Sequence, residues 1–189
     1  PMMVEVAALV SADKDRFISL WNGYSDELFT GNREVKECID FVCKEMGLAP
    51  VEGRLADAYK IMTDRVRLKL DPPADTLTFL SYLNTRNYLI GLISNCSNEV
   101  PVLWEDSRLA PMIEKPVFSC SVGLKKPDPR IYLLATGQLG VKPGECFFVD
   151  DNLEPLEGAA KLGMSAVLIQ DSRLNKTLID ADAWSGHII

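Results

Sequence analysis

Two short apolar runs in the C-terminal half of the sequence each end in a pair of polar side chains. Ser94 and Asn95 follow the first run. Asp150 and Asp151 follow the second, and between the two pairs Lys126 stands directly before a proline. Adjacent carboxylates repel each other unless a cation neutralises them, and oxygen ligands of this kind suit Mg²⁺. A hydroxyl and a lysine bind and neutralise phosphoryl oxygens, so the five residues together predict a phosphate site with Mg²⁺.

Each of these residues also has a simpler interpretation. The Ser-Asn pair could cap the next helix, and one of the two aspartates could do the same. Lys126 could be one solvated charge among many. The order along the chain favours the site, because the hydroxyl, the lysine and the acidic pair fall near the ends of neighbouring strands.

The elements that must position these residues are predicted by the pattern of residues 71–189. Short apolar runs alternate there with stretches of helical period, which is typical of a doubly wound parallel sheet in an α/β fold. Ligands bind beyond the carboxyl ends of the strands in such sheets. The expected strands are 88–93, 117–118, 146–149 and 166–169.

Residues 1–70 have a different character. From Asp13 onward three apolar stripes repeat with helical spacing, and no strand pattern interrupts them. Asn32 is placed to cap the second of these helices. The two prolines after Asp71 must end the third, because proline lacks the amide donor. The sequence therefore predicts a small all-helical unit over residues 1–70 and an α/β unit over residues 71–189.

Composition excludes several classes of function. The 189 residues are 47% hydrophobic and 25% charged with a net charge of −7, so a basic surface for nucleic acid is not expected. The single histidine, His187, excludes a His-rich zinc site and is interpreted as a solvated tail residue. Five cysteines without a C-x-x-C spacing indicate buried thiols in a reducing cytoplasm. No apolar stretch reaches the roughly 18 residues that a membrane span needs.

Three segments carry a resemblance to a known family. Residues 91–100, 122–132 and 146–152 resemble motifs II, III and IV of the haloacid dehalogenase (HAD) superfamily, in the family's order and spacing. The similarity is dense over residues 71–170, and residues 11–70 resemble the helical cap of one branch. The resemblance implies a Rossmann-like HAD core with a cap, and a hydrolase.

The phosphate-binding roles follow from that resemblance. It implies that Ser94 hydrogen-bonds a phosphoryl oxygen and that Asn95 helps to shape the cradle. It implies that Lys126 pairs with the phosphate and the nucleophile, while Lys125 is its solvated neighbour.

The resemblance also implies the metal site. Asp151 would bind Mg²⁺ directly, and Asp150 would share or support that site. The expected partner is a small phosphorylated substrate, and the oligomeric state is left open.

One departure from the family concerns its first motif, a strand that ends Asp-x-Asp-x-Thr and supplies the nucleophile. The residues before the first clear helix lack it, and residues 3–7 offer only Glu5, with Ala7 in place of the second acid. We therefore expect residues 2–10 to be cap helix and the chain to be truncated before the first strand. That strand lies between those ending at Ser94 and Asp150 in the family, so its loss would leave two unpaired edges.

The leading hypothesis is a Mg²⁺-dependent phosphatase of small metabolites that uses an aspartyl-phosphate intermediate, with the nucleophilic aspartate absent from this chain. One alternative is a catalytically inactive module that binds phosphate esters. Another is a 2-haloacid dehalogenase, which the acidic pair disfavours because a metal-free enzyme has no use for two crowded carboxylates. A phospho-acceptor receiver would carry its acidic pair early and its lysine last, the reverse of this order.

Overall fold

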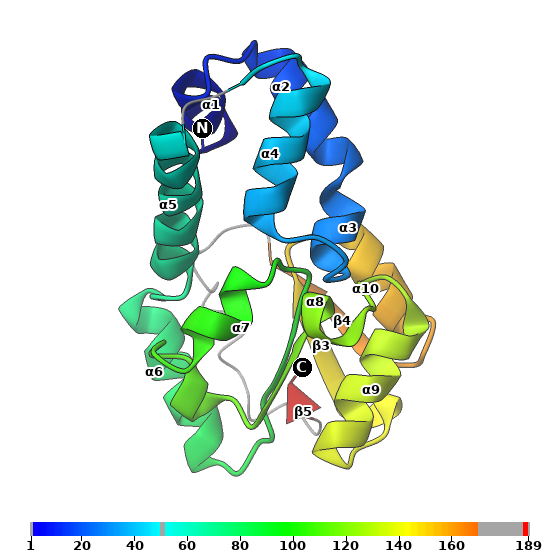
Figure 1. The fold of residues 1–189 in the computed structure, drawn as a ribbon. Helices are drawn as coiled ribbons and strands as arrows, with labels where there is room; N and C mark the ends of the chain where they lie inside the picture. The colour runs from blue at the N-terminus through cyan, green and yellow to red at the C-terminus, as the bar shows by residue number, and fades with distance from the viewer. Residues whose placement is uncertain (1, 50–51, 170–186, 189) are drawn as a thin grey trace.

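The computed structural model describes residues 2–49, 52–169 and 187–188 and has a helical half followed by an α/β half (Figure 1). In Figure 1 the first half lies above the strands. Its helices are α1 (Met2–Leu9), α2 (Lys14–Gly23), α3 (Ser25–Phe29), α4 (Val35–Glu45) and α5 (Glu52–Lys69). No helix in these ranges is long and apolar enough to cross a membrane.

The second half alternates strands with helices in the order α6, β1, α7, η1, β2, α8, α9, η2, β3, α10, β4, β5. Its strands are β1 (Gly91–Ser94), β2 (Lys115–Phe118), β3 (Cys146–Asp150), β4 (Ser165–Leu168) and β5 (His187–Ile188). Its α-helices are α6 (Ala74–Thr85), α7 (Glu99–Trp104), α8 (Ser119–Val122), α9 (Pro129–Leu139) and α10 (Leu153–Ala160). The 3₁₀ turns are η1 (Ala110–Met112) and η2 (Pro143–Glu145).

The helical half has a core of its own. Helix α4 shows why, because its apolar residues recur every three or four positions and line one face, which is buried. Phe17 on α2, Leu28 on α3 and Ile39 on α4 belong to the same buried cluster. Apolar residues of α1 and α5 complete it. The periodicity in residues 13–70 therefore predicted α4 and α5 correctly, whereas the stripe expected over residues 17–28 is divided between α2 and α3.

The expected cap of α4 was wrong. Glu34 occupies the position before the helix, and its backbone N–H donates to the Glu37 carboxylate at 3.1 Å. Asn32 instead donates from its side chain to the Thr30 hydroxyl at 2.9 Å. Glu37, in the first turn of α4, thus accepts from the Glu34 N–H. The sequence had assigned the cap to Asn32, two positions before Glu34.

The strands of the α/β half are parallel, which confirms the predicted fold class. They form two hydrogen-bonded groups among the described residues: β1 pairs with β2, and β3 lies between β4 and β5. Helix α9 packs on β1 and β2, whereas α10 packs on β3 and β4. Ser94 and Asp150 end β1 and β3, one strand in each group.

One expectation from the sequence concerned residues 2–10 and another concerned His187, and the structure agrees with the first only. Residues 2–9 are helical, as predicted, and Glu5 on α1 forms an ion pair with Arg65 of α5 at 3.1 Å. His187 was expected to lie in a solvated tail, but its backbone lies in β5 and pairs with Cys146 of β3. A strand of two residues is too short to show an alternating pattern, so this pairing could not be predicted from the sequence.

The two halves meet closely where the turn after α3 approaches α8. Gly31 has a left-handed backbone with φ of +74°, and an added Cβ would overlap the carbonyl oxygen of Cys120. Gly47 has a similar φ of +71° but open space around it. Gly31 is therefore required by both its backbone conformation and the close approach of α8.

The two glycines provide a matched test of this contact. We expect Gly47→Ala to lower the melting temperature by about 2–4 °C, because alanine in the left-handed region costs roughly 1 kcal/mol. Gly31→Ala should lower it at least about twice as much, because the overlap with Cys120 adds to the backbone strain. Thermal unfolding followed by circular dichroism measures both, and equal losses would contradict the close docking of the two halves.

Candidate functional site

The candidate site lies at the carboxyl ends of β1 and β3. Ser94 is the last residue of β1, with Asn95 directly after it, and Asp150 is the last residue of β3. Lys126 lies in the segment between α8 and α9 and contacts residues at both strand ends. The structure therefore brings Asn95, Lys126 and Asp150 together, as the sequence predicted.

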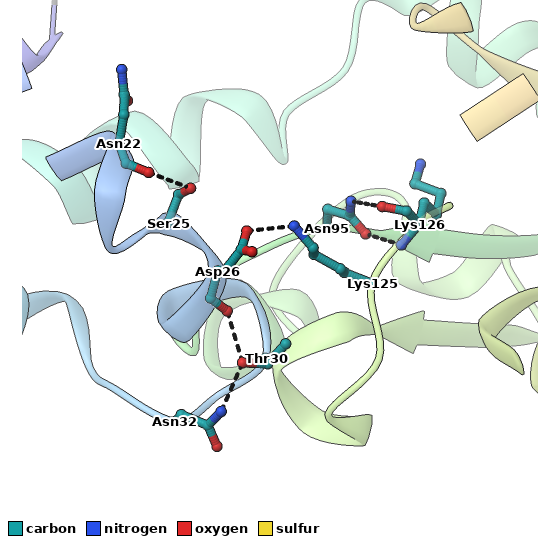
Figure 2. A network of polar contacts seen from close by, with 8 residues as sticks. All are labelled: Asn22, Ser25, Asp26, Thr30, Asn32, Asn95, Lys125 and Lys126. Atoms are coloured by element: carbon teal, nitrogen blue, oxygen red, sulfur yellow. Dashed lines mark hydrogen bonds and ion pairs between the residues drawn. The ribbon is translucent and has the colours of Figure 1, made fainter. Parts of the chain in front are cut away.

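Asn95 holds the backbone of Lys126 from both sides (Figure 2). Its side-chain Oδ1 accepts a hydrogen bond from the Lys126 N–H at 2.8 Å, and its Nδ2 donates to the Lys126 carbonyl oxygen at 3.0 Å. Only a primary amide offers a donor and an acceptor in this arrangement. Asn95 thus positions Lys126, whose peptide bond to Pro127 is cis.

The side chain of Lys126 forms a buried ion pair with Asp150. The Nζ to Oδ2 distance is 2.6 Å, and the two side chains are only 12% and 7% exposed. The other carboxylate oxygen of Asp150 accepts from the Asn152 backbone N–H at 2.9 Å. The Lys126 ammonium also lies 5.5 Å from the centre of the Phe148 ring. Charges this buried are tolerated because each has its partner.

The negative charge of Asp150 affects Tyr132, a buried residue of the adjacent core. Tyr132 of α9 donates its hydroxyl to the Pro155 carbonyl at 2.8 Å and contacts the Phe148 ring edge-on. Burial raises the pKa of the Tyr132 phenol, and the nearby carboxylate of Asp150 raises it further. Both effects favour the neutral phenol, which donates the hydrogen bond to Pro155.

Asp151 faces solvent, in contrast to its neighbour. Asp151 follows the last residue of β3, whereas Asp150 pairs with Lys126, so the two aspartates have different surroundings. No group of three or more His, Cys, Asp or Glu side chains gathers in the described part of the chain. Asp151 is thus the exposed carboxylate of the two, and Mg²⁺ is commonly held by one or two carboxylates together with water and substrate phosphate.

The family resemblance implied that Lys125 is a solvated neighbour of Lys126, but the structure gives it a partner. It forms an ion pair with Asp26 of α3, so the residue next to Lys126 contacts the helical half (Figure 2). In the same network the Asp26 backbone carbonyl accepts from Thr30 Oγ1 at 2.7 Å. Sequence reasoning missed Asp26 because it lies in a region with no motif and 99 positions from Lys125.

An Asp-x-Asp spacing occurs at Asp13 and Asp15, and the structure shows its local role. Asp13 caps α2 by accepting from the Arg16 backbone N–H at 2.9 Å, and Asp15 lies in the first turn of that helix. Carboxylates at these positions satisfy free N–H groups and complement the helix dipole. We therefore assign this pair to helix capping.

Comparison with known proteins shows the family. The model of haloacid dehalogenase-like hydrolases matches residues 7–163, and the chain belongs to this family. The curated relatives include (S)-2-haloacid dehalogenase 4A of Burkholderia cepacia, 31% identical over 70% of this chain and 56% of that protein. They also include a glyceraldehyde 3-phosphate phosphatase of Methanopyrus kandleri, 30% identical over 69% and 57%. The chain thus spans a little over half the length of either relative.

Solved structures of the family share the fold. A HAD family enzyme of Bacteroides thetaiotaomicron, in a magnesium complex, superposes with a TM-score of 0.65 at 20% identity, covering 88% of this chain and 90% of that one. L-2-haloacid dehalogenase of Xanthobacter autotrophicus with covalently bound chloropropionic acid gives a TM-score of 0.60 at 23% identity, covering 93% and 71%. Both solved structures therefore share the fold of this chain.

The contact between Asn95 and Lys126 gives a testable prediction. Asn95→Ala leaves a partly buried N–H and carbonyl of Lys126 without their partners, so the free energy of unfolding should fall by about 1–3 kcal/mol. Asn95→Asp should also destabilise, because a carboxylate cannot donate to the Lys126 carbonyl. Urea denaturation measures both variants. The control is Asn22→Ala, whose exposed side chain should matter little; an equal loss in that variant would refute the role of Asn95.

Proposed function

We propose that this chain carries the phosphate-binding and Mg²⁺-binding part of a HAD hydrolase that cleaves small phosphate monoesters. The observation that carries the proposal is the buried ammonium of Lys126, which Asp150 binds at the end of β3 while Asn95 at the end of β1 binds the Lys126 backbone. A fixed cation in a largely buried setting stabilises negative charge more than one in water does, because it needs no reorganisation.

The residues around Lys126 have complementary parts in this proposal. Ser94, at the end of β1, supplies a hydroxyl that donates to a phosphoryl oxygen. Asn95 keeps the Lys126 backbone in place, and Asp150 holds its ammonium at the strand end. A bound phosphate would share the ammonium with Asp150, so Lys126 serves both the fold and the ligand.

The acidic pair supports a divalent cation in the same proposal. Asp151 offers an exposed carboxylate and would be the principal protein ligand, with Asp150 supporting the site. When bound, Mg²⁺ supplies positive charge to the transferring phosphoryl group. The magnesium complex of the similar Bacteroides enzyme is in keeping with this assignment.

The division of labour between the halves is part of the proposal. We assign residues 1–70 as the cap and residues 71–189 as the core, and the contact between Asp26 and Lys125 links the two beside the site. The substrate would be a small molecule that the helical half selects. The attacking aspartate is not assigned to any residue at this edge, and the inactive phosphate-binding module stays the alternative if the protein binds phosphate without turnover.

A 2-haloacid dehalogenase is a second candidate, and two observations favour it. Several curated relatives are (S)-2-haloacid dehalogenases, including one that is 31% identical. The repulsion between the two aspartates, which suggested a cation, is already relieved in part because Lys126 neutralises Asp150. Phosphate release from an aryl phosphate with Mg²⁺ and chloride release from (S)-2-chloropropionate, assayed side by side, distinguish the two activities.

Lys126 and its neighbour Lys125 provide a matched pair for the phosphate site. We expect Lys126→Met to weaken inorganic phosphate binding and any phosphatase turnover roughly 10²-fold or more, as the loss of a fixed electrostatic stabiliser does. Lys125→Met removes the same charge but only a partly exposed pair with Asp26, and should change them by less than about tenfold. Binding is measured by calorimetry and turnover by phosphate release. Equal losses in the two variants would contradict the assignment.

The metal site is tested by Mg²⁺ titration. We expect Asp151→Asn to weaken Mg²⁺ binding at least about tenfold, because the substitution removes the charge of the proposed principal ligand. Asp57→Asn, an exposed carboxylate on α5, is the control and should bind like the parent protein. Unchanged affinity in Asp151→Asn, measured by isothermal titration calorimetry, would remove this residue from the site.

A further inference from the structure

Two buried thiols lie in contact directly behind the candidate site. Cys96 follows Asn95 in the segment between β1 and α7, and Cys120 lies in α8 just after β2. Their Sγ atoms are 3.9 Å apart, and the two residues are only 5% and 8% exposed. The chemistry proposed for the site uses neither of them.

The backbone segments that carry the two thiols are held together by a third side chain. The Ser119 hydroxyl, on a fully buried residue, accepts a hydrogen bond from the Cys96 N–H at 2.9 Å and donates to the Cys96 carbonyl at 3.4 Å. Ser119 precedes Cys120 in α8, so its two bonds fix the distance between the segments. The sulfur contact is therefore a property of the packed structure.

We propose that Cys96 and Cys120 are an oxidation site that closes to a reversible disulfide in the presence of a hydroperoxide. One thiol reduces hydrogen peroxide to water and becomes a sulfenic acid. The second sulfur then attacks that sulfenic sulfur, which forms the S–S bond and releases another water. Two thiols and one peroxide thus give one disulfide and two waters.

The bond requires only a small movement. A disulfide has a sulfur separation of about 2.05 Å, so the two sulfur atoms must approach by less than 2 Å. The chain is already closed into a loop here by β1, β2 and the Ser119 hydrogen bonds.

The other three thiols give the proposal its specificity. Cys38 and Cys43 are buried in α4, and Cys146 is buried in β3. Among the described residues the contact of Cys96 with Cys120 is the one recorded between two sulfur atoms. Burial, together with the neighbouring Cys120, raises the pKa of Cys96 to about 12. We therefore expect oxidation to be slow at neutral pH and to need sustained exposure to peroxide, because a buried thiol is rarely deprotonated.

Formation of the disulfide would change the geometry of the candidate site through residues next to it. Cys96 is adjacent to Asn95, which positions Lys126, and the Cys120 carbonyl is the group that Gly31 approaches. Closing the disulfide would therefore shift Asn95 and its hydrogen bonds to Lys126. It would also shift the Cys120 carbonyl, against which Gly31 of the helical half packs. The effect on phosphate binding rests on the proposed function, whereas formation of the bond does not.

The experiment exposes the whole folded protein to hydrogen peroxide, blocks free thiols with N-ethylmaleimide and digests with trypsin without reductant. Arg108 separates the two cysteines, so trypsin releases peptides 87–108 and 109–125. We expect mass spectrometry to find these two peptides joined and dithiothreitol to separate them. Joined peptides with any other pairing, or oxidation of Cys96 to the sulfinic acid without a bond, would overturn the proposal.

Two variants sharpen the test. Cys146→Ser should still form the joined peptides, whereas Cys120→Ser should not and should leave Cys96 as a sulfenic acid that dimedone traps. If Cys120→Ser fails to fold, the parent digest alone still decides, because it identifies the linked peptides directly. Inorganic phosphate binding before and after oxidation is then measured by calorimetry; a disulfide without any change in binding would contradict the coupling to the site but not the oxidation site itself.

Discussion

Lys126 connects two parts of the α/β half that share no recorded strand pairing. Strands β1 and β2 form one hydrogen-bonded group and β3, β4 and β5 another, within the described ranges. Asn95, at the end of the first group, binds the Lys126 backbone, while Asp150, at the end of the second, binds its ammonium. Because the ion pair is buried, either charge alone would be strongly unfavourable. This contact therefore helps to fix the relative position of the two strand ends, together with the apolar cluster that Ile93 of β1 shares with Phe148 of β3.

The sequence predicted the regular elements well, for physical reasons that act locally. Helical periodicity located the region of α2 to α5 without separating α2 from α3, and short apolar runs located β1 to β4 to within a few residues. The cap of α4 was misplaced because Glu34 and Asn32 are both capable of capping and only the backbone path selects between them. The pairing of His187 with β3 was not foreseen, since two residues at the end of a chain carry no strand pattern.

The candidate site was predicted as a set of residue types but not as a set of contacts. The carboxyl ends of parallel strands meet at one edge of a sheet, so Ser94 and Asp150 could be grouped from the sequence, and the order along the chain added Lys126. The partner of each charge could not be predicted, because it depends on the tertiary structure to within about an ångström. Asp150 pairs with Lys126 rather than repelling Asp151, and Lys125 pairs with the helical half. These contacts change the electrostatic interpretation: the cation that relieves the acidic pair is in part a lysine, which leaves both phosphatase and dehalogenase chemistry open within this family.

The most direct test of this account is a double-mutant cycle on the ion pair, with Lys126→Met, Asp150→Asn and the double variant compared by urea denaturation. Each single variant leaves a buried charge unpaired and should lose about 3–5 kcal/mol of stability, whereas the double variant should lose clearly less than the sum. A favourable coupling of at least about 1 kcal/mol is the predicted result. Additive losses would show that the two side chains do not stabilise each other, and would contradict the central position of Lys126.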